Sequence, residues 1–235
     1  MFINYAHRGA SEYYPENTMS AFDAGIRMGA NGIETDVQRT RDGELVLFHD
    51  ASLERVTGVS GMLADFMLEE LSTMCVRSKD GTRSDVIPTL EGFLAGYGSL
   101  DITFAIELKA DGVARDTIDL LERYHMREKV VLTSFSFENI REAKAYAPGY
   151  RVGLLYGEKE TDPVGKILSI GGEELCPHAS LVTKELVDRY HAMGLNVRAW
   201  GVANTDLMQN VYDSFGDGMT VNFPDKLTEY IGKKQ

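Results

Sequence analysis

The chain has 235 residues, 43% of them hydrophobic, and a formal net charge of −12. A chain of this length can bury a full core without disulfides or structural metals, so we expect one domain over residues 1–235. The acidic balance would repel a phosphate backbone and excludes nucleic acid as an expected partner, and an anionic substrate would need positive charge concentrated in a metal and a few basic side chains.

Short apolar segments alternate with helical stretches along the whole chain. Eight segments are expected to be strands, at residues 2–6, 31–37, 102–108, 130–135, 151–155, 174–177, 195–200 and 218–222. Apolar side chains at three-to-four spacing predict helices at residues 18–29, 112–125, 137–146, 183–193 and 204–213, and more weakly at 162–170. This alternation is typical of parallel strands with crossover helices, and eight strands predict an α/β fold of the (β/α)8 TIM barrel type, which occupies about 250 residues.

One segment, residues 43–98, breaks the regular alternation. It adds an apolar run at residues 45–48, followed by a loop containing Gly and Ser and by two short helical pieces. We interpret it as a small elaboration between the second and third strands. Residues 233–235 are expected to form a disordered tail.

The ends and the cysteines bear on the location of the protein. Residues 1–8 lack the basic start, apolar run and cleavage site of a signal peptide, and no apolar run reaches the roughly 18 residues of a membrane span. Cys75 and Cys176 fit no short-spacing metal or redox motif, and we interpret both as buried free thiols. We therefore expect a cytoplasmic protein that does not insert into a membrane.

Three acidic residues fall at inward positions of two predicted strands. Side chains alternate across a strand, so Glu34 and Asp36 share one face of the second strand, and Glu107 and Lys109 point into the barrel from the third. Three inward carboxylates at the C-terminal ends of strands would repel one another unless a cation lay among them. Salt-bridged polar residues in a barrel layer are the alternative, but the repeated spacing favours a metal site. Oxygen ligands favour Mg²⁺ or Ca²⁺ over zinc.

Two histidines are expected at the same rim. His7 ends the first strand and His49 follows the extra apolar run, and imidazole can act as base or acid near neutral pH. Arg8 and Lys109 supply the local positive charge that the acidic composition requires. The sequence leaves open whether His178, after the sixth strand, belongs to this rim.

Taken together, these segments resemble the glycerophosphodiester phosphodiesterase family. The matching segments are His7-Arg8-Gly9, Pro15-Glu16-Asn17-Thr18, Glu34-Thr35-Asp36-Val37, His49-Asp50 and Ile106-Glu107-Leu108-Lys109. Their order and spacing agree with the family through the first half of the chain, and their combination is highly specific.

The resemblance implies a barrel, a divalent metal on the three carboxylates Glu34, Asp36 and Glu107, and an acid–base pair. The pair would be His7 and His49. The remaining implied roles belong to residues that bind the substrate: Arg8 and Lys109 at the phosphate, Glu16 ordering the metal shell or a substrate hydroxyl, and Phe135 and Trp200 beside the glycerol. For Glu16, a first-turn charge favoured by the helix dipole is the alternative.

The second half of the chain departs from the family at two places. After Trp200 the family commonly has Thr-Val-Asn, whereas this chain has Gly201-Val202-Ala203-Asn204. Near the last strand the family usually has Thr-Asp before an aromatic residue and Pro, whereas this chain has Val221-Asn222-Phe223-Pro224. These changes are expected to affect substrate positioning and to leave the metal and both histidines in place.

The implied activity is metal-dependent hydrolysis of deacylated, water-soluble glycerophosphodiesters to glycerol 3-phosphate and an alcohol. The sequence leaves open the alcohol, the choice between Mg²⁺ and Ca²⁺, which histidine is the acid, whether water or a glycerol hydroxyl attacks first, and the oligomeric state. Two competitors remain: a barrel phosphodiesterase of the phospholipase D-like or inositol-lipid type, which would need a membrane-docking surface, and a non-catalytic phosphodiester-binding module.

Overall fold

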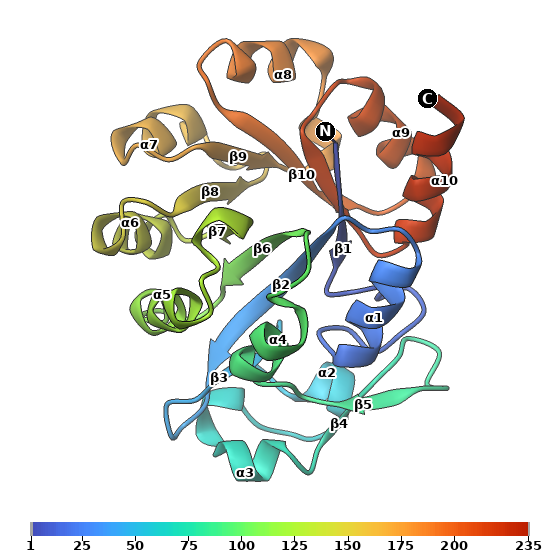
Figure 1. The fold of residues 1–235 in the computed structure, drawn as a ribbon, viewed down its shortest axis with the longest axis vertical. Coiled ribbons are helices and arrows are strands. Elements are labelled where there is room, and N and C mark those ends of the chain that lie inside the picture. The colour runs from blue at the N-terminus through green and yellow to red at the C-terminus, as the bar shows by residue number, and fades with distance from the viewer. Residues whose placement is uncertain (1, 235) are drawn as a thin grey trace.

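The computed structural model describes residues 2–234 and contains a closed barrel of eight parallel strands. The strands are β1 (Ile3–His7), β2 (Gly32–Arg39), β6 (Thr103–Leu108), β7 (Val130–Ser134), β8 (Arg151–Tyr156), β9 (Glu174–Pro177), β10 (Asn196–Val202) and β11 (Gly218–Val221). They pair in the order β1-β11-β10-β9-β8-β7-β6-β2, and a further pairing of β1 with β2 closes the ring (Figure 1). The TIM barrel prediction is confirmed.

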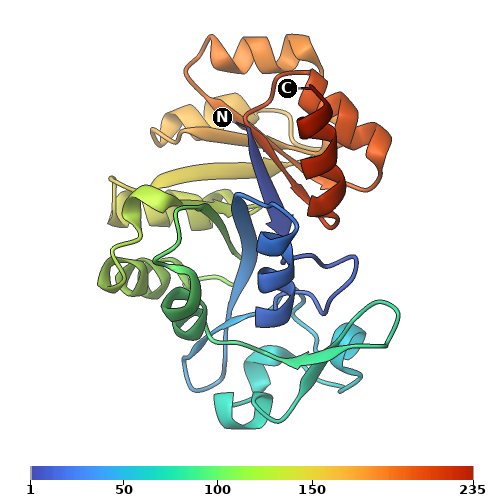
Figure 2. The same ribbon diagram turned by 45° about the vertical axis from the view of Figure 1, so that its right-hand side comes forward.

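A helix follows each barrel strand and packs on its outside (Figures 1 and 2). The helices are α1 (Met19–Arg27), α4 (Leu90–Tyr97), α5 (Ala114–Arg123), α6 (Phe137–Tyr146), α7 (Pro163–Ser169), α8 (Lys184–His191), α9 (Thr205–Asp213) and α10 (Pro224–Lys234), with 3-10 turns at η2 (Arg127–Lys129) and η3 (Ala179–Leu181). No helix within residues 2–234 is long and apolar enough to cross a membrane.

Two helices differ from expectation. Helix α4 lies inside residues 43–98, the predicted elaboration, yet it is the crossover helix that the barrel requires between β2 and β6. Helix α10 was not predicted, and it includes Lys233 and Lys234 of the expected disordered tail, while Gln235 lies outside the described residues. The prediction of a disordered Lys233 and Lys234 is wrong, because α10 carries Leu227 into the core and continues from there.

The strands place apolar side chains outward and polar side chains inward. On β6, Phe104 and Ile106 face the helices and belong to the main hydrophobic cluster, while Glu107 faces the barrel interior. The interior also holds a fully buried ion pair, in which Arg198 Nε lies 2.9 Å from Glu174 Oε1. The barrel therefore has an apolar outer layer and a charged interior.

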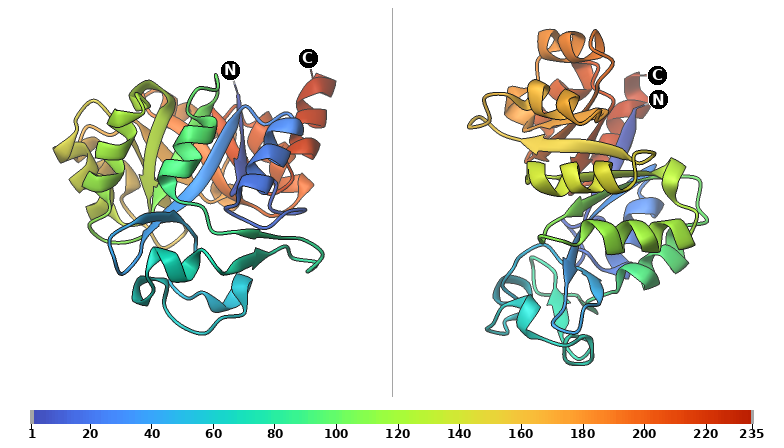
Figure 3. Two further views of the ribbon diagram at one scale, coloured as in Figure 1. Left: turned by 60° about the horizontal axis from the view of Figure 1, so that its bottom comes forward. Right: turned by 90° about the vertical axis from the view of Figure 1, so that its left-hand side faces the viewer.

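Residues 45–87, which we call the insert, lie outside the barrel. The insert contains β3 (Leu45–Leu47), α2 (Glu54–Thr57), η1 (Leu63–Asp65), α3 (Leu68–Leu71), and the hairpin β4 (Cys75–Arg77) and β5 (Ser84–Val86). Strand β3 pairs antiparallel with the last residues of β2, so the insert lies at the C-terminal end of the barrel, away from the chain termini (Figure 3, left). It has its own small hydrophobic cluster, which includes Phe48, Leu53 and Leu63.

The two cysteines lie in different surroundings. Cys176 is buried inside the barrel, as predicted, but Cys75 is exposed on the insert. The prediction of a buried Cys75 is wrong because β4 lies in a two-stranded hairpin in which Val76, rather than Cys75, faces the insert's hydrophobic cluster.

Candidate active site

Three buried carboxylates meet at the C-terminal end of the barrel. Glu34 and Asp36 come from β2 and Glu107 from β6, and the register pairs Asp36 with Glu107 across the two strands. One oxygen from each of the three carboxylates lies within 4.8 Å of the other two. The structure thus brings together the three residues that the sequence assigned to a metal.

The electrostatics of this carboxylate cluster favour a bound cation. Burial, reinforced by the charge of Asp36, raises the pKa of Glu34 well above its usual range and that of Glu107 to about 7. Burial opposes ionisation of Asp36 as well, but Arg8, His49 and Lys109 outweigh it and lower its pKa to about 2.

One oxygen of Asp36 also lacks a hydrogen bond. Within residues 2–234, the buried Asp36 Oδ1 accepts no hydrogen bond, and Lys109 Nζ lies 3.8 Å from it. A buried carboxylate oxygen without a hydrogen bond costs free energy, and the two neighbouring carboxylates resist ionisation. Hard divalent cations such as Mg²⁺ or Ca²⁺ bind such oxygen ligands, so the residues present fit the metal that the sequence predicted.

A tight turn after β1 aims Arg8 at the carboxylate cluster. Arg8 and Gly9 have φ angles of 55° and 82°, and a Cβ at Gly9 would lie 2.4 Å from the carbonyl carbon of Ala21 in α1. Gly9 is therefore required where the backbone passes close to the helix. Arg8 Nε then lies 3.1 Å from Asp36 Oδ2, and Arg8 Nη1 donates to Glu16 Oε1 at 2.9 Å.

Asn17 has a role that the sequence did not indicate. The residue after it, Thr18, is the N-cap of α1. The Asn17 amide donates to Asp36 Oδ2 at 2.8 Å and accepts a hydrogen bond from Thr35 Oγ1 at 2.8 Å. Asn17 therefore fixes the orientation of Asp36, as partners of metal-binding carboxylates commonly do.

His7 lies beside the carboxylate cluster. Its Nδ1 lies 2.6 Å from Asn222 Oδ1, which also accepts a hydrogen bond from Ser11, and its Nε2 lies 3.8 Å from Glu34 Oε2. Burial and the nearby charge of Arg8 lower the pKa of His7 to about 3. Asn222 occupies one of the positions that depart from the family pattern, and it contacts His7 directly.

His49 approaches the carboxylate cluster from the insert. Its Nδ1 lies 2.5 Å from Asp50 Oδ1. The Gln38 amide donates to the carbonyl oxygens of His49 and Asp50 at 3.1 Å and 2.8 Å, which ties this loop to β2. Burial lowers the pKa of His49, although Asp36 and Asp50 oppose that shift.

Lys109 and Glu16 make ion pairs within the site. Lys109 Nζ donates to Glu107 Oε1 at 2.9 Å and lies 3.8 Å from Asp36 Oδ1. Glu16 lies before α1 and accepts hydrogen bonds from Arg8 and Arg55, so it is not a first-turn helix charge. Sequence reasoning did not single out Arg55.

Aromatic side chains form a wall on another side of the site. The rings of Phe135 and Trp200 are 4.7 Å apart and perpendicular, and His178 packs against Trp200 at 4.8 Å. His178, left open by the sequence, therefore contacts the aromatic wall. Gly201 has a φ of 70°, and a Cβ there would lie 2.4 Å from the His178 ring, so the Thr that the family commonly has would collide with it.

Most of these side chains line one cavity of about 170 Å³. Its lining residues are His7, Arg8, Glu34, His49, Glu107, Phe135, Leu155, Arg198, Trp200, Gly201 and Thr220. Glu16, Asp36 and Lys109 are not among them, although each contacts a residue that is. Arg198 was missed, and the alternation along β10 could have found it, since it lies two residues before Trp200.

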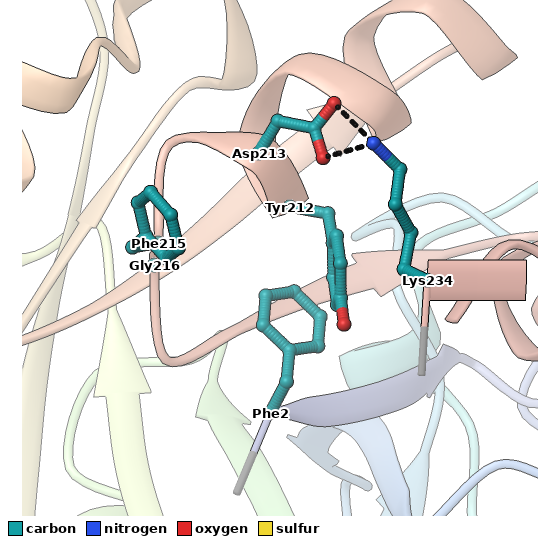
Figure 4. A pocket seen from close by; sticks show the side chains of 6 residues that line it. All are labelled: Phe2, Tyr212, Asp213, Phe215, Gly216 and Lys234. Carbon is teal, nitrogen blue, oxygen red and sulfur yellow. Dashed lines mark hydrogen bonds and ion pairs between the residues drawn. The ribbon is translucent and has the colours of Figure 1, made fainter. Parts of the chain in front are cut away.

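A larger cavity of about 560 Å³ lies at the opposite end of the barrel (Figure 4). Phe2 precedes β1 there, and Phe215 and Gly216 precede β11. Its charged lining residues, Asp213 and Lys234, neutralise each other at 3.1 Å. Barrel enzymes place their chemistry at the C-terminal ends of the strands, so the smaller cavity is the candidate active site.

Similarity to known proteins identifies the family of the chain. The family model described as the glycerophosphoryl diester phosphodiesterase family matches residues 7–226. A glycerophosphodiester phosphodiesterase from Caldanaerobacter subterraneus subsp. tengcongensis is 32% identical over 235 residues, which cover 97% of either chain. One from Bacillus altitudinis is 30% identical over 232 residues, which cover 94% of this chain and 95% of the relative.

Solved structures share the fold. A phosphodiesterase from Oleispira antarctica, determined in complex with the product sn-glycerol-3-phosphate, has a TM-score of 0.86 and 24% identity over 98% of this chain and 96% of that chain. A glycerophosphodiester phosphodiesterase described as putative, from Galdieria sulphuraria, has a TM-score of 0.88 and 24% identity over 99% of this chain and 98% of that chain. Since the family match extends over most of the sequence and the first relatives align almost end to end, the chain is an enzyme of the glycerophosphoryl diester phosphodiesterase family.

Proposed function

We propose that this enzyme hydrolyses glycerophosphodiesters to glycerol 3-phosphate and an alcohol within a single barrel domain. The observation that carries the proposal is one cavity lined by Glu34, Glu107, an arginine and two histidines, with Asp36 completing the buried carboxylate cluster. Glu34, Asp36 and Glu107 would hold one divalent cation, Mg²⁺ or Ca²⁺. When bound, the cation would supply a Lewis acid for the phosphoryl oxygens.

Two basic side chains stabilise the phosphate group. Arg8 lies against Asp36, and Lys109 lies against Glu107, so both present positive charge at the edge of the carboxylate cluster. Charge builds on the non-bridging oxygens as the phosphodiester is cleaved, and preorganised donors at that position lower the barrier. Glu16 holds the Arg8 guanidinium in place, and we assign it this role instead of contact with the metal shell.

The hydrogen-bond partners of the two histidines suggest different roles. Asn222 Oδ1 can only accept, so His7 carries its proton on Nδ1 and keeps a lone pair on Nε2, as a general base requires. Asp50 lies behind His49, and its carboxylate stabilises a doubly protonated ring, as a general acid requires. We assign His7 to the proton of the attacking oxygen and His49 to the leaving alcohol.

The substrate is expected to be a small, deacylated diester. The glycerol arm would lie against Phe135 and Trp200, whose rings form one wall of the cavity. The cavity of about 170 Å³ is smaller than the roughly 300 to 1,000 Å³ of sites that enclose drug-sized ligands, which disfavours two acyl chains. The net charge of −12 also disfavours an anionic bilayer as a docking surface.

The exposed thiol of Cys75 bears on the cellular compartment in which the enzyme acts. Cys75 is exposed and unpaired, and free thiols persist in reducing compartments. We propose that the enzyme acts in the cytoplasm on dissolved substrates.

A coupled assay tests the proposed function. Glycerophosphocholine, glycerophosphoethanolamine and glycerophosphoglycerol are supplied with Mg²⁺ or Ca²⁺, and glycerol 3-phosphate is detected with its dehydrogenase. All three are expected to release glycerol 3-phosphate, while a diacyl phospholipid in micelles reacts poorly. Preferential attack on the diacyl lipid, or equal turnover of diesters that lack the glycerol hydroxyls, would contradict the proposal.

A further inference from the structure

We propose that Arg55, on α2 of the insert, is a positioning residue that holds the catalytic histidine His49 and the phosphate-binding Arg8 in one arrangement. The proposal rests on the function proposed above. Arg55 lies outside the carboxylate cluster and contacts none of its three members among the interactions of residues 2–234.

The guanidinium of Arg55 joins two carboxylates from different parts of the chain. Its Nη1 and Nη2 donate to Glu16 Oε2 and Oε1 at 2.9 Å and 2.7 Å, and its Nε donates to Asp50 Oδ2 at 2.5 Å. The pairing with Glu16 is bidentate, a geometry that fixes both partners in orientation as well as distance.

Each of these two carboxylates also contacts a residue of the site: Asp50 contacts His49, and Glu16 contacts Arg8. The other oxygen of Asp50 binds His49 Nδ1 at 2.5 Å, which sets the tautomer and the orientation of that ring. Glu16 Oε1 also accepts from Arg8 Nη1 at 2.9 Å, and Arg8 reaches Asp36 at 3.1 Å. A continuous series of contacts therefore links His49 to Arg8 through Asp50, Arg55 and Glu16.

The burial of Glu16 separates its pairing with Arg55 from an ordinary surface ion pair. The Arg55 side chain is 48% exposed, but that of Glu16 is only 14% exposed. Exposed ion pairs contribute little to stability and would not justify a catalytic effect. Loss of Arg55 would leave Arg8 as the one remaining partner of the partly buried Glu16 among residues 2–234, and would release Asp50 from its fixed position behind His49.

The test compares Arg55→Ala with a matched control. Arg41→Ala removes another exposed arginine that binds the insert, through Glu70 at 3.4 Å, and contacts no residue of the site. Arg55→Ala is expected to lower kcat on glycerophosphodiesters by about 10- to 100-fold, the range typical of residues that orient a ligand or catalyst. Arg55→Lys is expected to recover part of the loss, and Arg41→Ala is expected to stay within about twofold of the wild type.

A double-mutant cycle distinguishes positioning from general damage to the fold. If Arg55 acts through His49, Arg55→Ala should lower kcat much less in the His49→Ala background than in the wild type. The remaining decrease would be the part that acts through Arg8, so the two losses in kcat should be strongly non-additive. Unchanged turnover in Arg55→Ala, or fully additive losses, would overturn the proposal.

A readout that does not depend on turnover keeps the two proposals separate. In ¹⁵N-histidine-labelled enzyme, the Nδ1–H signal of His49, assigned by its loss in His49→Ala, is expected to shift or broaden in Arg55→Ala and to stay in place in Arg41→Ala. An unmoved signal would overturn the positioning role. Absence of wild-type turnover on every glycerophosphodiester, with the signal shifted as expected, would instead contradict the proposed function alone.

Discussion

The carboxylates of the barrel and the histidine of the insert are held in place in different ways. Hydrogen bonds between neighbouring strands position the carboxylates, whereas side-chain contacts position His49. Glu34 and Asp36 are fixed by the backbone ladder that joins β2 to β6. His49 follows the three-residue strand β3 and depends on Gln38, Asp50 and, through Asp50, on Arg55. The barrel thus holds its carboxylates on a rigid sheet, whereas the position of the His49 ring in the insert depends on a few side-chain hydrogen bonds.

The two regions also differ in their hydrophobic clusters. The main cluster surrounds the whole barrel, while the insert has a small cluster that includes Phe48, Leu53 and Leu63. Regions with few buried apolar contacts open locally at lower free energy than the global transition. We therefore expect the insert to open while the barrel stays folded.

The largest effect is expected when the barrel loses one of its charges. Glu34→Gln should reduce turnover by more than about 10³-fold, because it removes a proposed metal ligand from the electrostatic centre of the site. Burial and the charge of Asp36 raise the pKa of Glu34 and so disfavour its charged form when no metal is bound. The neutral Gln variant should therefore melt close to the temperature of metal-free wild type. Calorimetry with and without Mg²⁺ should show that the metal stabilises only the wild type. A variant still stabilised by Mg²⁺ would remove Glu34 from the metal site.

Alanine variants of the two histidines allow a direct comparison of the barrel with the insert. His7→Ala, in the barrel, and His49→Ala, in the insert, should each lower kcat by roughly 10² to 10⁴, the usual contribution of general acid–base catalysis. Circular dichroism should show an intact fold in both variants. Near-normal turnover of either variant would remove that histidine from the mechanism, and with it the division of catalytic groups between barrel and insert.

Substitutions in the two hydrophobic clusters should have smaller effects, on the free energy of unfolding and on hydrogen exchange. Leu132→Ala in β7 and Leu53→Ala in the insert both empty fully buried positions, at a local cost of about 2 to 5 kcal/mol. The barrel variant should lower the global free energy of unfolding, whereas the insert variant should speed hydrogen exchange mainly within residues 45–87. Uniform acceleration of exchange in both variants would mean that barrel and insert unfold as one unit.

Most of the barrel could be predicted from the sequence, because strand and helix periodicities are local. The convergence of the carboxylates could be predicted for the same reason, since alternation places Glu34 and Asp36 on one face of a strand. The α4 helix was assigned to the elaboration although its N-cap, Thr89, marks where it begins.

The network around the histidines could not be predicted in this way. Arg55 meets Glu16 across 39 residues of sequence, and Asn222 meets His7 across 215. Sequence shows which residue types are present, but not which side chains become neighbours when the ring of strands closes. Sequence periodicity therefore predicted the positions of Glu34, Asp36 and Glu107, although Arg198 on β10 was overlooked. It could not predict the tertiary contacts of Arg55 and Asn222.

Metal removal tests the central claim most directly. Wild-type enzyme is stripped with a chelator, assayed on glycerophosphocholine, and then assayed again after stepwise addition of Mg²⁺ or Ca²⁺. Because Glu34, Asp36 and Glu107 converge within 4.8 Å, we predict that stripped enzyme releases no glycerol 3-phosphate and that one of these ions restores turnover. Since the pKa of Glu107 is raised to about 7 and metal must displace its proton, less metal should be needed at pH 8 than at pH 6. Full turnover after exhaustive chelation would contradict the account.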